Sequence, residues 1–248
     1  MKFLALDTDI LMYRAASSAE VETDWGDDIW SLQTNLKDAK DAFQFQLDKI
    51  RERLGVKEYV CCLSDHTSNF RKDIDPTYKS NRKGTRKPVG YVALCTWVEE
   101  NFETFRKPSL EADDCLGILA TMPTNKDKCI MVSDDKDLKT VFGQLYRPTA
   151  DELLTISEAD ADRFFLTQVL TGDATDGYSG VKGIGPKTAE KLLGHRPHWG
   201  AVEQAYLKAG MTRDDAIQQA RLARILRFSE WDEVKGEVKL WHPDTKPS

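Results

Sequence analysis

Three short apolar runs, each followed within two residues by an aspartate, constrain the fold of this chain more than any other feature. The runs occupy residues 3–6, 59–63 and 128–133, and the aspartates are Asp7, Asp65 and Asp134. Unbroken runs of this length are typical of buried strands. A helical repeat of apolar residues at 36–54 separates the first two runs. This alternation predicts an α/β fold with a doubly wound, mostly parallel sheet.

Further acids stand beside these predicted elements. Three of them open a predicted helix, two follow the third strand, and two end an apolar helix that begins after Ser157; in that order they are Glu111, Asp113, Asp114, Asp135, Asp137, Asp173 and Asp176. The last two are three residues apart, a spacing at which both can reach one cation from the same face. Each group alone can also be a helix cap or a set of surface acids. Together they can converge on the ligand-binding edge of the sheet.

Many carboxylates without a histidine and cysteine ligand set favour Mg²⁺ or Mn²⁺ over zinc. The chain has five cysteines, an odd number without C-x-x-C spacing, which we expect to be reduced core thiols.

A basic segment at residues 69–87 follows the second predicted strand. Its seven cations outnumber two acids, and two aromatic residues lie among them: Arg71, Lys72, Lys79, Arg82, Lys83, Arg86 and Lys87, with Phe70 and Tyr78. Such a segment is often only a solvated surface. It also suits a nucleic acid, because cations neutralise phosphates and aromatic rings stack on bases. The net charge of −6 does not exclude this partner, since acids of a metal site can be separate from a basic face.

A glycine-rich stretch at residues 180–189 reads as a phosphate-binding element. Gly180, Gly183 and Gly185 precede Pro186, which suits the first turn of a helix that stops at Gly194. The free N–H groups at the start of that helix would point toward an anion. The alternative is an ordinary loop that leads into a helix.

The length of the chain allows one large core with a smaller lobe. Helical patterns continue at 198–209 and after Thr212, whereas residues 17–35 and 228–248 remain unassigned. The first apolar run is too short for a signal peptide and no run is long enough to cross a bilayer, so we expect a cytoplasmic protein without membrane contact.

These blocks, in this order, resemble the flap-endonuclease and 5′-nuclease superfamily. The blocks are Asp7, Asp65 with Phe70-Arg71, and residues 78–82, 111–114, 135–137, 172–176 and 180–189. Within the superfamily the chain looks most like the double-strand-specific 5′ to 3′ exonucleases of short-tailed bacteriophages. The resemblance implies a nuclease core at 1–170 with a basic arch at 66–88, and a helix-three-turn-helix element with a helical lobe at 171–248.

The resemblance also implies roles for individual residues. Two Mg²⁺ or Mn²⁺ ions would be held by Asp7, Asp65, Glu111, Asp113 and Asp114, and by Asp135, Asp137, Asp173 and Asp176. Catalytic cations would be Lys79 and Arg82. DNA would contact Arg71, Lys72, Tyr78, Lys83, Arg86, Lys87, Lys182, Gly183, Gly185, Lys187 and Thr188. Asp9 and Asp134 depart from the family pattern and are left out of the predicted ligands.

The implied activity is metal-dependent 5′ to 3′ hydrolysis of duplex DNA from a 5′ end, by a two-metal mechanism, in phage DNA replication or degradation. RNA strands of RNA–DNA hybrids and 5′ flaps are further implied substrates, and K⁺ is implied at the helix-three-turn-helix. The basic segment is short for an arch, which favours degradation from an end over threading of a flap. We expect a monomer in the host cytoplasm, and the sequence names no replication partner.

Two other functions fit parts of the sequence. Asp7-Thr8-Asp9 after a buried strand matches the nucleophile signature of haloacid-dehalogenase phosphatases, in which Asp7 would form an aspartyl phosphate. That alternative leaves the basic segment and the glycine-rich stretch unexplained. A DNA-binding module with structural metal ions is the second alternative.

Overall fold

The computed structural model describes residues 1–82 and 84–245. Its central sheet has six strands in the order β5-β4-β1-β6-β7-β8. The strands are β1 (Phe3–Asp7), β4 (Glu58–Cys62), β5 (Thr104–Phe105), β6 (Cys129–Val132), β7 (Gly143–Arg147) and β8 (Glu152–Ile156). All neighbours are parallel except β7 and β8. The predicted α/β fold with a mostly parallel sheet is confirmed.

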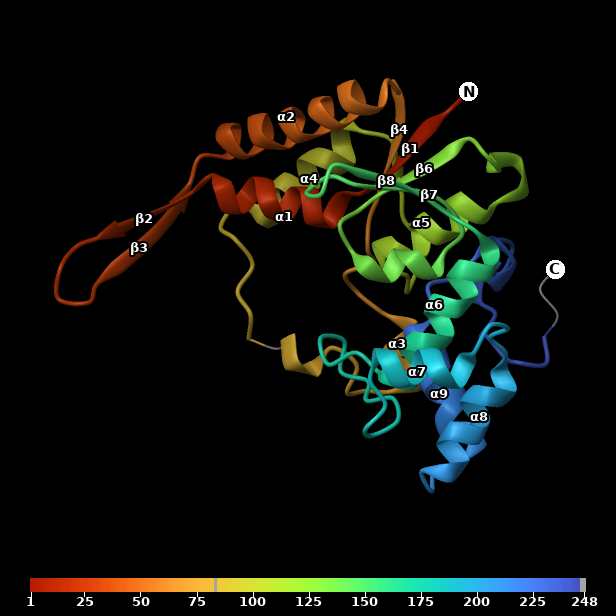
Figure 1. Cartoon of the computed structure of the whole chain (residues 1–248). Coiled ribbons are helices and arrows are strands. Elements are labelled where there is room, and N and C mark those ends of the chain that lie inside the picture. Colours follow the sequence, from red (N-terminus) through yellow and green to blue (C-terminus); the bar gives the residue numbers. More distant parts are fainter. Residues whose placement is uncertain (83, 246–248) are drawn as a thin grey trace.

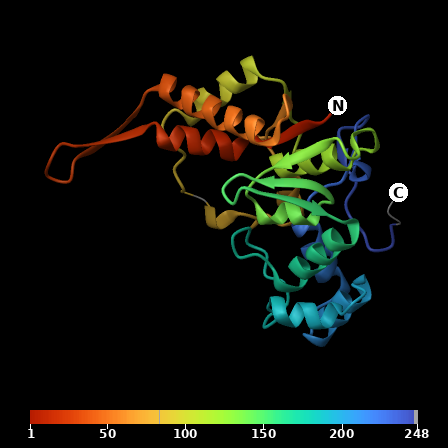
Figure 2. The same cartoon turned by 45° about the horizontal axis from the view of Figure 1, so that its top comes forward.

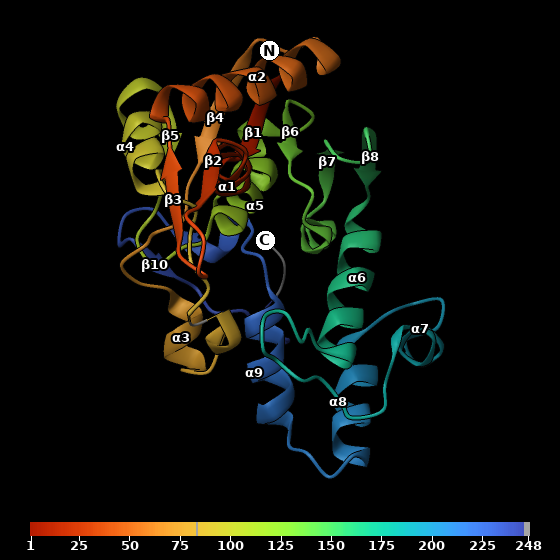
Figure 3. The same cartoon turned by 90° about the vertical axis from the view of Figure 1, so that its left-hand side faces the viewer.

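Helices cover both faces of the sheet because successive side chains of each strand point to opposite sides. Leu4 and Leu6 of β1 join a core with α1 (Thr8–Ser18), α2 (Leu36–Leu54) and α4 (Tyr91–Asn101). Ala5, between them, joins the core on the other face with α5 (Ala112–Thr121). Figure 3 shows the strands side by side, and Figure 1 shows α1 and α2 on the side opposite α5.

The segment before α2, which could not be assigned from the sequence, is an antiparallel hairpin. Strand β2 (Glu20–Asp24) pairs with β3 (Trp30–Thr34), and the hairpin projects away from the body of the molecule (Figures 1 and 2). Trp25 at its tip is 69% exposed. Because the hairpin buries little of its surface, its two strands have no buried apolar face of the kind from which a strand can be predicted.

A helical lobe packs below the sheet (Figure 1). It contains α6 (Glu158–Thr171), α7 (Pro186–Leu193), α8 (Trp199–Lys208) and α9 (Arg213–Ala223), whose buried side chains share one core. The basic segment is broken into α3 (Phe70–Ile74) and η1 (Ser80–Arg82). Short elements complete the description: η2 (Pro123–Asn125), η3 (Lys136–Thr140), η4 (Phe228–Glu230), β9 (Trp231–Asp232) and β10 (Glu237–Val238).

All five cysteines are free and buried, as expected for reduced core thiols. Within the described residues, every helix is too short or too polar to cross a lipid bilayer.

Candidate active site

The first group of acids lies at the carboxyl end of β1. Asp7 is 7% exposed, and its Oδ2 accepts a hydrogen bond from the Ser133 hydroxyl at 2.7 Å. The pKa of Asp7 is raised to about 7, chiefly by burial and also by the charges of Asp9 and Asp135, against the lowering effect of the Ser133 hydrogen bond. Burial is also the main cause that raises the pKa of Asp113, and the charges of Asp7 and Asp135 raise it in addition. These carboxylates therefore lie close enough to repel one another.

Two carboxylate oxygens of this group are buried without a hydrogen-bond donor in the described part of the chain. They are Oδ1 of Asp9 and Oδ1 of Asp113. A buried anionic oxygen without a partner is unfavourable, and neighbouring like charges make it more so. A bound cation would offset both effects, and a donor set made only of oxygen suits a hard divalent ion. The residues present thus fit Mg²⁺ or Mn²⁺.

Asp9 is a residue that the sequence analysis left out and the structure places beside Asp7. Its Oδ2 accepts a hydrogen bond from the Ser64 amide at 3.3 Å, which joins the first turn of α1 to the segment after β4. The D-x-D spacing after the first strand was the signal that could have found it. Asp134, also left out, instead pairs with Arg14 at 2.7 Å and accepts hydrogen bonds from Thr149.

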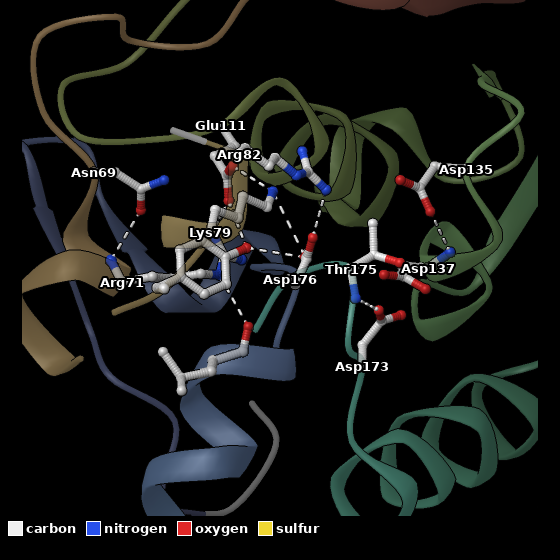
Figure 4. Close-up of polar contacts among 12 residues, drawn as sticks. Asn69, Arg71, Lys79, Arg82, Glu111, Asp135, Asp137, Asp173, Thr175 and Asp176 are labelled. Carbon is white, nitrogen blue, oxygen red and sulfur yellow. Dashed lines mark hydrogen bonds and ion pairs between the residues drawn. The ribbon is translucent and has the colours of Figure 1, made fainter. Parts of the chain in front are cut away.

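The second group of acids joins η3 to the loop after α6 (Figure 4). Asp135 Oδ1 accepts a hydrogen bond from the Asp137 amide at 2.8 Å, and the Lys136 ammonium lies between Asp137 and Asp173. Asp173 Oδ1 accepts a hydrogen bond from the Thr175 amide. Since Asp135 also raises the pKa values of Asp7 and Asp113, it stands between the two groups.

The expected arrangement of Asp173 and Asp176 on one helix face is wrong. Helix α6 ends at Thr171, and both acids lie in a turn that Asp173 closes by pairing with Tyr178. Their carboxylates point to different cations, since Asp173 contacts Lys136, whereas Asp176 contacts Lys79 and Arg82. Figure 4 shows Asp176 facing Lys79 and Arg82. The turn therefore separates the two carboxylates.

The predicted catalytic cations face these acids. Lys79 Nζ is 2.6 Å from Glu111 and 3.6 Å from Asp176, and Arg82 is 2.7 Å from Asp176. The Tyr78 hydroxyl donates to Glu111 at 3.0 Å and to Asp176 at 3.1 Å. Although burial opposes ionisation of Glu111, the charges of Lys79 and other cations lower its pKa to about 2.

Several carboxylates of the site form ion pairs with lysine and arginine side chains. Across residues 1–82 and 84–245, no three acids, thiols or imidazoles are already grouped at metal-ligand spacing. Lys79 instead lies between Glu111 and Asp176, and Lys136 between Asp137 and Asp173, while Arg82 pairs with Asp176. The arrangement can bind anions through these cations and hard cations through the acids.

The chain matches the family model described as the 5′-3′ exonuclease, N-terminal resolvase-like domain, over residues 2–161. That match covers more than half of the chain. The chain belongs to the 5′-3′ exonuclease family. The resemblance seen in the sequence is thereby confirmed, and the chain is an enzyme that acts as a nuclease on DNA.

Two phage proteins are similar to this exonuclease over nearly their whole length. The exonuclease of Escherichia phage T7 is 32% identical, and the comparison covers 97% of this chain and 93% of the relative. The exodeoxyribonuclease of Enterobacteria phage T3 is 31% identical over 97% and 92%.

Among solved structures, the T5 D15 protein co-crystallized with metal ions has a TM-score of 0.64 at 17% identity, and the match covers 90% of this chain and 89% of that one. The catalytic core of Rad2 in complex with a DNA substrate has a TM-score of 0.51 at 15% identity, over 84% and 65%. At these identities the likeness shows a shared fold.

One acid that was predicted to hold metal pairs with an arginine inside the exonuclease. Asp114 is fully buried, and both its oxygens accept hydrogen bonds from Arg71 at 2.7 Å. The same oxygens also accept hydrogen bonds from the amides of Glu111 and Leu226. Asp114 therefore has an internal cation partner, and the prediction that it ligates metal is corrected.

Asp65, another predicted ligand, accepts several local hydrogen bonds. Its oxygens accept hydrogen bonds from Thr67, Ser68 and the Ser109 amide, with the Thr67 and Ser109 amides each at 2.8 Å. The hydrogen bonds of Thr67 lower the pKa of Asp65 most, because they favour its ionised form. Asp65 thus closes a turn after β4, and its role as a metal ligand stays a prediction.

The aromatic residues of the basic segment do not offer rings to bases. Tyr78 is 3% exposed and Phe70 is 7% exposed, and Arg71 is 3% exposed. The prediction of Arg71 and Tyr78 as DNA contacts is therefore corrected, because both side chains pack inside the exonuclease. Lys72 and Arg86 do remain at the surface.

The other predicted DNA contacts lie on the surface. Lys87 is exposed, as are five residues around the start of α7: Lys182, Gly183, Gly185, Lys187 and Thr188. Helix α7 begins at Pro186, and Gly183 has a φ of +84°, in the left-handed region that favours glycine. The loop before α7 therefore presents backbone and two lysines to solvent. Lys83 lies outside the described residues.

Proposed function

We propose that the chain degrades duplex DNA from a 5′ end with two divalent cations, Mg²⁺ or Mn²⁺. The observation that carries this proposal is a pair of buried oxygens, one on Asp9 and one on Asp113, that have no hydrogen-bond donor within the described residues and lie in a group of mutually repelling acids. The T5 D15 protein crystallized with metal ions and the Rad2 core in complex with DNA support the proposal by analogy, since both share this fold.

The first ion would be held by Asp7, Asp113 and Asp135, with Asp9 beside them. The second would be held by Asp137 and Asp173. Such ions, when bound, activate a water and stabilise charge on the leaving oxygen. Asp135 would serve both positions, because it lies between the two groups of acids.

The protein's own cations would act on the phosphate. Lys79 and Arg82 stand next to Glu111 and Asp176, on the side of the site that the basic segment covers. Their positive charges would neutralise the negative charge that develops on the phosphate in the transition state. Glu111 and Asp176 would orient these two side chains toward the substrate.

Duplex DNA would bind through the exposed start of α7. The N–H groups of the first turn and the charges of Lys182 and Lys187 suit a backbone phosphate. Thr188, in the first turn of α7, adds a hydroxyl donor. We propose K⁺ in this loop as the family resemblance implies.

We further propose a monomer that acts in the host cytoplasm during phage DNA replication or degradation. RNA strands of hybrids and 5′ flaps are proposed as further substrates. The short basic segment, broken into α3 and η1, favours degradation from an end over threading of a long flap. The haloacid-dehalogenase and DNA-binding-module alternatives are not supported, since the family match and the named relatives are exonucleases.

The test is digestion of a linear duplex labelled at either the 5′ or the 3′ end, beside a covalently closed circle, in Mg²⁺ or EDTA. We expect early release of the 5′ label in Mg²⁺, no release in EDTA, and an intact circle. Early release of the 3′ label, or cutting of the circle, would contradict degradation from a 5′ end. Activity in EDTA would contradict the metal requirement.

A further inference from the structure

We infer that Lys136 is a built-in competitor for the second divalent ion. Its ammonium occupies the position between Asp137 and Asp173 that this ion would take. The inference rests on the proposed two-ion function and adds to it a residue that sets how tightly the second ion binds.

The ammonium bridges two acids that are far apart in the sequence. Lys136 Nζ is 3.1 Å from Asp137 Oδ1 and 2.5 Å from Asp173 Oδ2. Asp137 lies in η3, and Asp173 lies in the loop after α6. A monovalent cation thus already balances the repulsion between carboxylates that a divalent ion would balance more fully.

The two carboxylates are held independently of Lys136. Asp137 Oδ1 accepts a hydrogen bond from Gln168 Nε2 at 2.6 Å, and Gln168 is only 6% exposed on α6. Asp173 Oδ1 accepts a hydrogen bond from the Thr175 amide at 2.7 Å. Departure of the ammonium would therefore leave both acids in place to receive another cation.

The ammonium is also able to leave. The Lys136 side chain is 58% exposed, whereas those of Asp137 and Asp173 are 16% and 8% exposed. A solvent-exposed ammonium on a flexible stem recovers its hydration when it moves away. Lys79, with 19% of its side chain exposed, is more enclosed among its acids and is not expected to be displaced in this way.

Competition has a defined thermodynamic consequence. When a ligand must displace a resident group, its apparent dissociation constant equals the intrinsic constant divided by the fraction of molecules in which the group is not bound. Removal of the ammonium should therefore tighten binding of the second ion and lower the stability of the metal-free protein. If Lys136 only supported the local structure, its removal would lower the stability of the metal-free and the metal-bound protein alike. If Lys136 helped to hold the ion, its removal would lower the affinity of the protein for that ion.

The experiment is Mn²⁺ titration of the full-length protein by calorimetry and by electron paramagnetic resonance of free Mn²⁺, with thermal unfolding in EDTA and in Mn²⁺. The Asp173→Asn variant should bind one Mn²⁺ ion fewer, and the ion that it fails to bind is the one held at this position. Lys136→Gln should bind the same ion about two- to fivefold tighter, given the usual strength of a partly exposed ion pair. Its midpoint of unfolding should fall in EDTA and not in Mn²⁺.

Lys139→Gln is the matched control, since Lys139 lies in the same short helix and makes no ion pair within the described ranges. It should leave the affinity for Mn²⁺ unchanged. An equal or weaker Mn²⁺ affinity in Lys136→Gln, or an equal fall of the midpoint in both conditions, would overturn the competition while the two-ion function stood. If the Asp173→Asn variant bound as many Mn²⁺ ions as the unaltered protein, the second metal position and the competition would both be overturned.

Discussion

Arg71 and Asp114 form a two-point ion pair in the interior of the exonuclease. Each terminal nitrogen of Arg71 donates to one oxygen of Asp114 at 2.7 Å, and the two residues are 3% and 0% exposed. Arg71 also donates to the carbonyls of Leu222 and Arg224. One side chain thus ties α3 of the basic segment to α5 and to the end of α9.

Replacement of Arg71 by methionine is expected to destabilise the protein severely. Loss of one partner leaves the Asp114 carboxylate buried without its cation, which costs roughly 3–5 kcal/mol of unfolding free energy. Urea denaturation followed by circular dichroism measures this loss. Lys72→Met, at the exposed neighbouring position, should change stability by less than about 0.5 kcal/mol. A cost below about 1 kcal/mol for Arg71→Met would contradict the buried pair.

Asp113→Asn is expected to abolish cleavage and preserve DNA binding. The substitution removes the charge from the buried oxygen that is proposed to face the first ion. Duplex binding in Ca²⁺, by fluorescence anisotropy, should stay within about twofold, because binding relies mostly on phosphate contacts elsewhere. Asp134→Asn is the control, since Asp134 pairs with Arg14 and Thr149 outside the site. A fully active Asp113→Asn protein would remove Asp113 from catalysis.

Gly180→Ala is expected to distort the loop that carries Asp173 and Asp176. Gly180 has a φ of +58°, and a Cβ there would lie 2.3 Å from the Gly172 amide nitrogen. Overpacking against backbone and the left-handed conformation together should cost about 2–4 kcal/mol.

Gly183→Ala separates these two causes, because Gly183 also has a positive φ but has open space around a Cβ. It should cost about 1 kcal/mol. Both losses are read from thermal unfolding. Equal effects of the two substitutions would show that the close approach of Gly172 and Gly180 is unimportant.

Local patterns predicted the elements that bury a regular face. The apolar repeat marked α2 at its observed bounds of Leu36–Leu54, and Pro186 and Gly194 bracket α7 as expected. Asp7 and Asp135 could be placed at the sheet edge because strand ends in a parallel sheet share that edge.

Pairings between distant residues could not be read in the same way. A charged run such as 69–87 does not show that Arg71 turns inward to Asp114, which lies 43 residues away. The choice depends on the packing of α3 against α5 and α9, which is a property of the whole fold. Asp9 was left out because it departs from the family pattern, and only the fold shows that its Oδ1 is buried without a donor in the described part of the chain.

Lys182→Ala and Lys187→Ala are each expected to weaken duplex binding at every sequence and to reduce its salt slope by about one unit. Each lysine lies exposed beside the start of α7. Lys191→Ala, near the other end of the same helix, should leave the slope unchanged. Binding constants measured by anisotropy at several salt concentrations give the slopes. An unchanged slope would show that these lysines do not contact DNA phosphates and are ordinary surface residues.

Glu20→Gln is expected to loosen the end of the basic segment from the base of the hairpin. Glu20 accepts two hydrogen bonds from Arg86, at 2.6 and 2.7 Å, and one from the Val89 amide at 2.7 Å. The Arg86 hydrogen bonds, and then that of Val89, lower the pKa of Glu20 to about 2. The neutral amide keeps the shape but loses the ion pair, so trypsin should cut after Arg86 several times faster.

The pH dependence of this contact follows from the sign of the shift. A carboxyl group with a lowered pKa stabilises the fold above its unfolded value, near 4.5, and this contribution disappears as the pH falls toward 2. The midpoint of thermal unfolding should therefore be higher for the unaltered protein than for Glu20→Gln at pH 7, and the difference should shrink steadily below pH 4.5. Glu22→Gln, on the same strand and exposed, should show no difference at either pH. A difference that persisted unchanged to pH 2.5 would mean that the substitution acts through shape and not through the charge of Glu20.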